Sequence, residues 1–316
     1  MAHHIESLLV SLNEKNCGVY QYGELVADTL GMHHIAVSSV DELALKCFEL
    51  NPKTLVWNWH PATLYAANIT PKTLKNSGFK SAINICLMHE FDPEVIKGDD
   101  FDATGFSDPS CGYRHEKFFR LPRIVPEFER GHLALPADPV IGSFGVGLPH
   151  KGYDRVAELT KKSFTHATIR LHIPRFWAAD PDGANAARIV RDVMEIVGPN
   201  YRVEHTDTWL SRNELISWLS VNTINLLPYP SNPHSGISSS TDLAIACGRP
   251  FGITRSGLFK HLHHLPINVD ACTLEEIINL DPKIFEELRQ EWSPKRFREE
   301  WTWMITYTSE SLGSRK

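Results

Sequence analysis

Short apolar runs alternate along the chain with stretches whose apolar residues recur at helical spacing. In the second half this alternation predicts strands at residues 140–144, 167–173, 201–205, 223–229 and 250–253. The helices predicted between them lie at 153–162, within 183–197, at 212–222 and at 239–247. In the first half the pattern predicts strands at 54–59 and 81–87 and helices at 23–30 and 40–50. Strands that alternate with helices are typical of parallel βαβ units, so we predict an α/β fold.

A proline-rich stretch divides this pattern in two. Residues 120–139 contain four prolines among charged residues and have weak periodicity, as a connection between domains would. We therefore predict one domain over residues 1–137 and a second over 138–293. The remaining segment, 294–316, begins with an amphipathic helix that places Phe297, Trp301 and Met304 on one side. That apolar side needs a surface to pack on.

Charge and cysteine spacing narrow the class of protein. The 316 residues carry a formal net charge of −6, whereas proteins that track nucleic-acid phosphates usually have clustered basic residues, so we expect no nucleic-acid partner. No apolar run approaches the roughly 20 residues that cross a bilayer, and the start of the chain lacks the layout of a secretory signal. Six cysteines without a Cys-x-x-Cys pair favour reduced thiols. We expect a cytoplasmic protein with no membrane span.

A glycine-rich loop follows the predicted strand 140–144. It contains Gly145, Gly147, Lys151 and Gly152 and leads into a predicted helix. Glycines let backbone N–H groups approach a phosphate closely, and a lysine before the helix adds a positive charge. The loop has neither the Gly-Lys-Ser/Thr of a Walker loop nor the Gly-x-Gly-x-x-Gly of a dinucleotide site. A glycine turn with a surface lysine is the alternative explanation.

A second loop, before the predicted helix 239–247, is rich in small residues. They are Ser235, Gly236, Ile237, Ser238 and Ser239. They leave room at the helix start, where free N–H groups and the positive end of the helix dipole favour a diphosphate. Ser239 and Asp242 also have the spacing of a capping box, which needs no ligand. A cap does not explain His234, the glycine and the serines together, so we assign this loop to ligand binding.

This second loop resembles a family signature. Residues 234–250 are similar to the donor-binding motif of retaining glycosyltransferases with the GT-B fold (family 4, group 1), which is written Glu-x7-Glu and ends in Ala-Cys-Gly-x-Pro. Here the frame is His234-x7-Asp242 followed by Ala246-Cys247-Gly248-Arg249-Pro250, so the spacing is kept and both acids differ. The resemblance implies two Rossmann-like domains whose parallel sheets face a central cleft.

Other segments match that family in order along nearly the whole chain. Residues 144–152 resemble its diphosphate loop, 16–23 its first-domain glycine loop, and the last helix the one that crosses back onto the first domain. The resemblance implies that Lys151 pairs with the diphosphate, with Gly145 in the same loop and Gly18 in the loop of the first domain. The arginine of the family's diphosphate loop is missing because Val146 follows Gly145. Lys151 then acts alone, or a more distant arginine, Arg170 or Arg255, supplies the second charge.

The resemblance also implies contacts with the rest of the donor. Asp242 would accept hydrogen bonds from the ribose hydroxyls, and residues 235–239 would offer N–H groups to phosphate and sugar. His234 would meet the sugar hydroxyls, although an imidazole cannot reproduce a bidentate carboxylate.

Histidines that end strands of the first domain are further candidates. In the family a histidine in this region touches the donor sugar or the acceptor, which makes His89 the first candidate and His60 the second. A histidine held by structural hydrogen bonds is the alternative. The histidine groups at 33–34 and 261–264 lack acids or cysteines at ligand spacing, so we expect no metal.

Together, the patterns and the resemblance predict a metal-independent glycosyltransferase of the hexosyl type, active in glycan biosynthesis. It would move a sugar from a nucleotide-diphosphate sugar to a glycan or other small acceptor, with retention of configuration and no further cofactor. Two alternatives stay open. One is a nucleotide-sugar epimerase, and the other is a non-catalytic or partner-dependent nucleotide-sugar-binding protein, for which the altered acids and the missing arginine argue.

Overall fold

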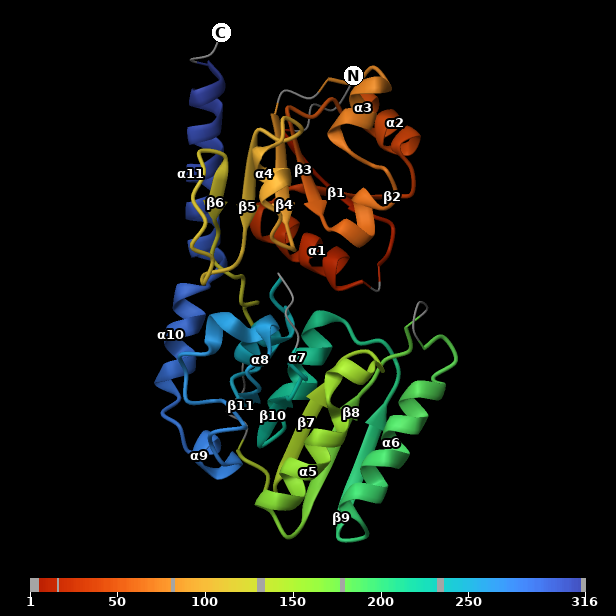
Figure 1. Cartoon of the computed structure of the whole chain (residues 1–316), viewed down its shortest axis with the longest axis vertical. Helices are drawn as coiled ribbons and strands as arrows, with labels where there is room; N and C mark the ends of the chain where they lie inside the picture. The colour runs from red at the N-terminus through yellow and green to blue at the C-terminus, as the bar shows by residue number, and fades with distance from the viewer. Residues whose placement is uncertain are drawn as a thin grey trace. The chain divides into compact units, whose positions relative to one another are not determined.

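A computed structural model of the chain describes residues 6–15, 17–80, 83–129, 134–176, 180–231 and 236–313 (Figure 1). These residues form two compact units. The first unit takes the described residues of 1–124, 235–237 and 292–316, and the second those of 125–234 and 238–291. The units divide between Ile124 and Val125, earlier than the position near Asp138 predicted from the prolines. Residues 121–129 and 134–139 form neither helix nor strand.

The first unit is built on a parallel sheet with the strand order β2-β1-β3-β4-β5-β6. Its strands are β1 (Ser7–Leu12), β2 (His33–Val37), β3 (Thr54–Trp59), β4 (Ile83–Met88), β5 (Ala103–Phe106) and β6 (Phe118–Arg120). Its helices are α1 (Gly18–Leu30), α2 (Val40–Leu50), α3 (Pro71–Asn76), α4 (Pro93–Lys97) and α11 (Pro294–Gly313), with a helical turn at Pro61–Tyr65.

Apolar cores cover both faces of this sheet. Alternate residues of each strand point to opposite faces, so Val10 and Trp57 pack with α2 and α3, while Leu9 and Val56 pack with α1. The second core also contains three residues of α11, Phe297, Trp301 and Met304. The apolar side of the last helix is therefore buried against the sheet of the first unit.

The second unit has a five-stranded parallel sheet in the order β11-β10-β7-β8-β9. Its strands are β7 (Val140–Phe144), β8 (Ala167–His172), β9 (Tyr201–Thr206), β10 (Ile224–Leu227) and β11 (Phe251–Ile253). Its helices are α5 (Tyr153–Ser163), α6 (Ala184–Val197), α7 (Arg212–Ser220), α8 (Ser240–Cys247), α9 (Leu274–Ile278) and α10 (Lys283–Glu291), with helical turns at Pro149–Lys151 and Gly257–Leu262.

The strand order reverses direction at β7, and this reversal determines where the helices lie. From β7 the chain moves outward through α5 to β8 and through α6 to β9, and it then returns through α7 to β10 on the other side of β7. Because such crossovers are right-handed, α5 and α6 lie on one face and α7 and α8 on the other. The carboxyl ends of β7 and β10 are adjacent at the reversal, where open parallel sheets leave a crevice for ligands.

The α/β fold with two Rossmann-like parallel sheets is confirmed, and the predicted elements of the second half all form. The prediction missed four strands of the first half, β1, β2, β5 and β6. It also began α1 at Gly23 rather than at Gly18, because residues 16–23 resemble the family's first-domain glycine loop. Gly23 is required inside the helix, since a Cβ at this position would lie 2.5 Å from Asn58 Nδ2.

Candidate functional site

The glycine-rich loop and the serine-rich loop meet at the strand reversal of the second unit. Gly152 lies between the turn Pro149–Lys151 and α5, with a φ of +66°, and a Cβ there would lie 2.2 Å from the carbonyl oxygen of Pro228. Only glycine allows the two backbones to approach this closely. Gly145 has a φ of +135°, and its carbonyl oxygen accepts a 2.6 Å hydrogen bond from Tyr153 Oη.

A chain of polar side chains joins the two loops. Lys151 Nζ donates to Tyr229 Oη over 2.9 Å and lies 4.2 Å from the centre of the tyrosine ring. Tyr229 Oη is 3.1 Å from Ser240 Oγ, which also accepts a 3.1 Å hydrogen bond from Ser238 Oγ. An ammonium group can only donate, so the phenol oxygen accepts from Lys151, and either hydroxyl can donate in its contact with Ser240. The lysine is thereby tethered beside the start of α8.

The start of α8 is not capped in the way its sequence suggests. Ser239 has φ −70° and ψ −9°, which is helical rather than extended, and its side chain makes no capping hydrogen bond. The predicted capping box of Ser239 and Asp242 is therefore wrong. Instead, Ser238 Oγ accepts a 3.3 Å hydrogen bond from the N–H of Ser240, and Thr241 Oγ1 donates to the Ser238 carbonyl over 2.9 Å. The N–H of Asp242 in turn donates to the Ser239 carbonyl over 3.1 Å, so local groups hold these two amides, and the helix start attracts an anion through its dipole.

The predicted donor residues after β10 lie in different environments. Asp242 lies in the first turn of α8 and is only 2% exposed, so its carboxylate is covered in this conformation. Gly236 and Ile237 group with the first unit, where the backbone of Gly236 pairs with that of Glu90. His234 and Ser235 lie outside the described residues.

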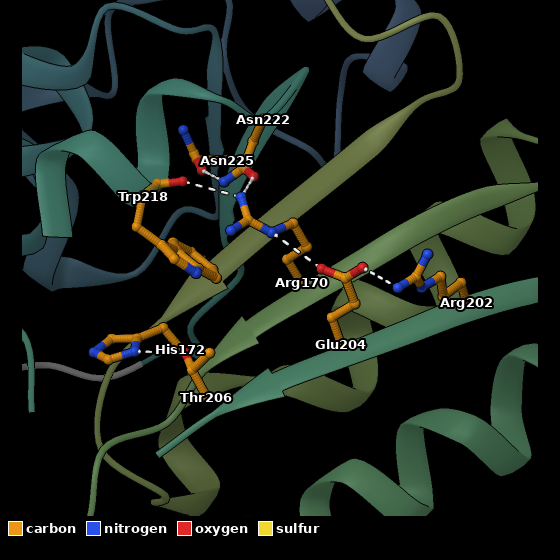
Figure 2. Close-up of polar contacts among 8 residues, drawn as sticks. All are labelled: Arg170, His172, Arg202, Glu204, Thr206, Trp218, Asn222 and Asn225. Atoms are coloured by element: carbon orange, nitrogen blue, oxygen red, sulfur yellow. Dashed lines mark hydrogen bonds and ion pairs between the residues drawn. The ribbon is translucent and has the colours of Figure 1, made fainter. Parts of the chain in front are cut away.

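Of the two arginines proposed to assist Lys151, Arg170 is already engaged (Figure 2). Its Nη1 donates to Asn222 Oδ1 over 2.6 Å and to the Trp218 carbonyl over 3.1 Å, and its Nε lies 3.5 Å from Glu204 Oε2. The guanidinium stacks 4.4 Å from the Trp218 ring. Arg170 pairs in register with Gly142, within the sheet rather than at its carboxyl edge.

The position of Arg170 leaves Arg255 as the remaining candidate for a second charge. Arg255 is exposed and follows the carboxyl end of β11, the strand next to β10.

His172, at the end of β8, is buried and forms a hydrogen bond of 2.9 Å with Thr206 Oγ1 (Figure 2). Burial, together with the nearby His205, lowers the pKa of His172 to about 4, so its ring is neutral near pH 7.

The histidines predicted in the first unit lie near each other at the carboxyl edge of its sheet. His89 follows β4, His60 follows β3, and their ring centres are 6.4 Å apart. His89 Nε2 lies 2.6 Å from Asn58 Oδ1, while His60 Nε2 lies 3.5 Å from Glu90 Oε1. A Cβ on Gly236 would lie 2.8 Å from the His89 carbonyl oxygen, so the two backbones touch.

Gly18, the residue predicted in the loop of the first domain, is instead the first residue of α1. It follows the N-cap residue Cys17, whose side chain makes no capping hydrogen bond.

Two residues central to these arrangements were not predicted. Tyr229 lies two residues after β10 and is 1% exposed. From the sequence alone, the simplest interpretation of this residue was an aromatic side chain in the core. Asn58 is fully buried within β3. Its position inside an otherwise apolar strand was the signal that could have revealed its role, because a buried amide needs hydrogen-bond partners.

Two kinds of feature are absent from the described ranges. No three histidine, cysteine, aspartate or glutamate side chains group there as metal ligands would. None of the helices in these ranges combines the length and the apolarity that a bilayer crossing requires.

Comparison with known proteins finds relatives by structure alone. No family model and no curated protein matches the sequence. HepE of Anabaena, solved with UDP and glucose, superposes with a TM-score of 0.68 at 10% identity, covering 96% of this chain and 100% of that one. A glycosyltransferase of Rickettsia africae gives 0.63 at 11% identity, with 97% and 98% covered.

Sucrose-phosphate synthase of Thermosynechococcus elongatus gives a TM-score of 0.61 at 11% identity and covers 99% of this chain and 98% of that one. These structures match both units of the chain over nearly their full length. At sequence identities of 10% to 11%, this similarity shows the fold alone. The chain therefore has the GT-B fold, in which these glycosyltransferases are built.

Proposed function

We propose that this protein is a glycosyltransferase that takes its sugar from a nucleotide-diphosphate sugar. The observation that carries the proposal is Lys151, tethered through Tyr229 to the uncapped start of α8 at the strand reversal. A lysine beside the positive end of a helix dipole matches a diphosphate in charge, and its ammonium group supplies hydrogen-bond donors. The fold supports the same donor class, because HepE was solved with UDP-glucose.

In this proposal the leaving diphosphate is stabilised by the protein's own groups. Negative charge develops on the diphosphate as the bond to the sugar breaks, so donors fixed in advance lower the barrier. Lys151 is such a donor beside the positive end of the α8 dipole, with Arg255 as a second cation, and no metal is required. His89 would contact a hydroxyl of the sugar or of a glycan acceptor. Transfer of a hexose with retention of configuration belongs to the proposal through the family resemblance.

Nucleotide binding is the direct test. We expect UDP and UDP-sugars to raise the melting temperature of the protein by a few degrees, because a ligand at a hundredfold its Kd stabilises the native state by about 2.7 kcal/mol. A panel of UDP-, GDP- and ADP-sugars identifies the base, and inorganic phosphate serves as the control ligand. Absence of a shift with the whole panel would rule out the proposed donor site.

Binding without transfer would favour the non-catalytic alternative. The altered frame, with His234 and Asp242 in place of two glutamates, is the specific observation behind that alternative. A transfer assay on the nucleotide sugar that binds best separates the two functions, since only an enzyme releases nucleotide diphosphate in the presence of acceptor glycans.

Substitution of Asp242 tests the proposed ribose contact. We expect Asp242→Asn to weaken nucleotide binding by about 1–3 kcal/mol, the value of hydrogen bonds to a charged acceptor. Asparagine preserves the shape of this nearly buried side chain, so calorimetric titration of the folded variant reports the lost charge. Asp154→Asn, at an exposed position in the first turn of α5, is the matched control. Unchanged affinity in Asp242→Asn would assign this carboxylate to the fold alone.

A further inference from the structure

A buried amide lies under the carboxyl edge of the sheet in the first unit. Asn58, in β3, is fully buried, and its Nδ2 donates to the Val19 carbonyl over 2.7 Å and to Ser11 Oγ over 2.9 Å. Its Oδ1 lies 2.6 Å from His89 Nε2. Ser11 Oγ also lies 2.8 Å from His34 Nε2, so the chain of contacts runs across three neighbouring strands and on to His89.

The carbonyl of Val19 determines which way this amide faces. A carbonyl oxygen can only accept, so the NH₂ group of Asn58 must lie toward Val19. Oδ1 then lies toward His89, and an amide oxygen can only accept as well. His89 Nε2 must therefore carry the hydrogen in this contact. The Nε2–H form follows from the hydrogen-bond network, without any assumption about the ligand.

Close packing confines the side chain of Asn58, and its hydrogen-bond partners fix which end of the amide faces His89. A Cβ on Gly23 would lie 2.5 Å from Asn58 Nδ2 and 2.9 Å from Ser11 Oγ, so helix α1 lies directly against both groups. Turning the amide over would place Oδ1 against the Val19 carbonyl and NH₂ against His89. The network thus has one satisfied arrangement, and buried polar groups that lose their partners are costly, about 1–3 kcal/mol each.

The surroundings of His89 favour its neutral form. Burial, together with the nearby His60 and Arg123, lowers the pKa of His89 to about 3. Tyr22 packs edge-on at 5.2 Å between ring centres, and Glu90 faces His60 at 3.5 Å. A neutral ring with hydrogen on Nε2 has its lone pair on Nδ1. His89 is partly exposed. Among the residues that the structure describes, the hydrogen bond found for its ring is the one from Nε2 to Asn58.

We infer that Asn58 is a positioning residue that holds His89 as the Nε2–H form, so that Nδ1 accepts a hydrogen bond from a carbohydrate hydroxyl. The carbohydrate part of this inference rests on the proposed function. An imidazole held in this way orients a hydroxyl and does not supply a proton. The histidine at this site therefore acts by alignment of a sugar rather than as a general acid.

Nitrogen NMR tests the inference without any ligand. We expect long-range ¹H–¹⁵N spectra to show His89, assigned through His89→Gln, as the Nε2–H form without titration between pH 8 and pH 5. We expect Asn58→Asp to raise the pKa of His89 into this range, because a carboxylate beside the ring favours its charged form. Asn84→Asp, at the opposite end of β4, adds the same charge and should leave His89 unchanged.

The outcomes separate this inference from the proposed function. An Nδ1–H form in the wild type, or titration near pH 6.5, would overturn the inference even if nucleotides bind. If Asn58→Asp does not fold, the wild-type spectrum still decides. With UDP-glucose, UDP-galactose and UDP-N-acetylglucosamine at saturation, at least one is expected to move the Nδ1 resonance relative to UDP alone. If none moves it and added glycan acceptors do not either, the role toward a hydroxyl is rejected.

Discussion

Lys151→Ala is expected to lower the rate of sugar transfer by about a hundredfold to a thousandfold, the usual effect of removing one fixed donor at a site of developing charge. Lys151 is the cation that the polar chain through Tyr229 and Ser240 holds beside the uncapped start of α8. The substitution removes both the charge and the tether. Single-turnover kinetics with the nucleotide sugar that binds best measure the effect on the chemical step.

Two control variants separate charge from structure. Lys162→Ala removes an exposed lysine from the last turn of α5 and should leave the rate unchanged. Tyr229→Phe keeps the ring under Lys151 and removes only the hydroxyl, so we expect a smaller loss of rate than in Lys151→Ala. The free energy of unfolding of Lys151→Ala should stay close to that of the wild type. A normal rate in this variant would mean that another group neutralises the diphosphate.

Most of the second half of the chain could be predicted because four of its strands, β7, β8, β10 and β11, are largely buried. Segments such as 167–173 and 223–229 are apolar or β-branched along most of their length, and amphipathic helices separate them. In the first half, β2 begins with His33 and His34, which hide its strand character, and β5 and β6 are too short to give a period. Such strands are stabilised mainly by contacts with neighbouring strands in the sheet, and these contacts cannot be predicted from the local sequence.

Sheet topology determined how much of the candidate site could be predicted from the sequence. Both loops of the second unit were predicted because the carboxyl ends of parallel strands lie at one edge, whatever the side chains are. The partners of the predicted residues were missed because they are remote in sequence: Tyr229 lies 78 positions after Lys151, and His89 lies 31 after Asn58. Arg170 was one of two arginines considered for the diphosphate because of its charge, whereas its partners Asn222 and Glu204 become visible only in the folded unit.

Gly152→Ala is expected to destabilise the second unit by about 2–4 kcal/mol and to weaken nucleotide binding. Part of this effect is the strain of a left-handed backbone at φ +66°, about 1 kcal/mol for a residue with a Cβ. The larger part is steric, since the new Cβ would lie 2.2 Å from the backbone oxygen of Pro228, and overpacking of this kind costs about 1–3 kcal/mol. Urea unfolding followed by tryptophan fluorescence measures the loss.

Gly31→Ala separates the two contributions to the Gly152 effect. Gly31 has nearly the same left-handed backbone, φ +64° and ψ +32° against +66° and +37°, and a Cβ there would meet nothing within 4 Å, so its alanine variant carries the backbone strain without the clash. We expect Gly152→Ala to be clearly the less stable of the two and to lose nucleotide affinity, while Gly31→Ala keeps it. Equal stability and equal affinity would mean that the two loops need not touch. In that case the close approach of Gly152 to Pro228 could not be what brings Lys151 to the start of α8.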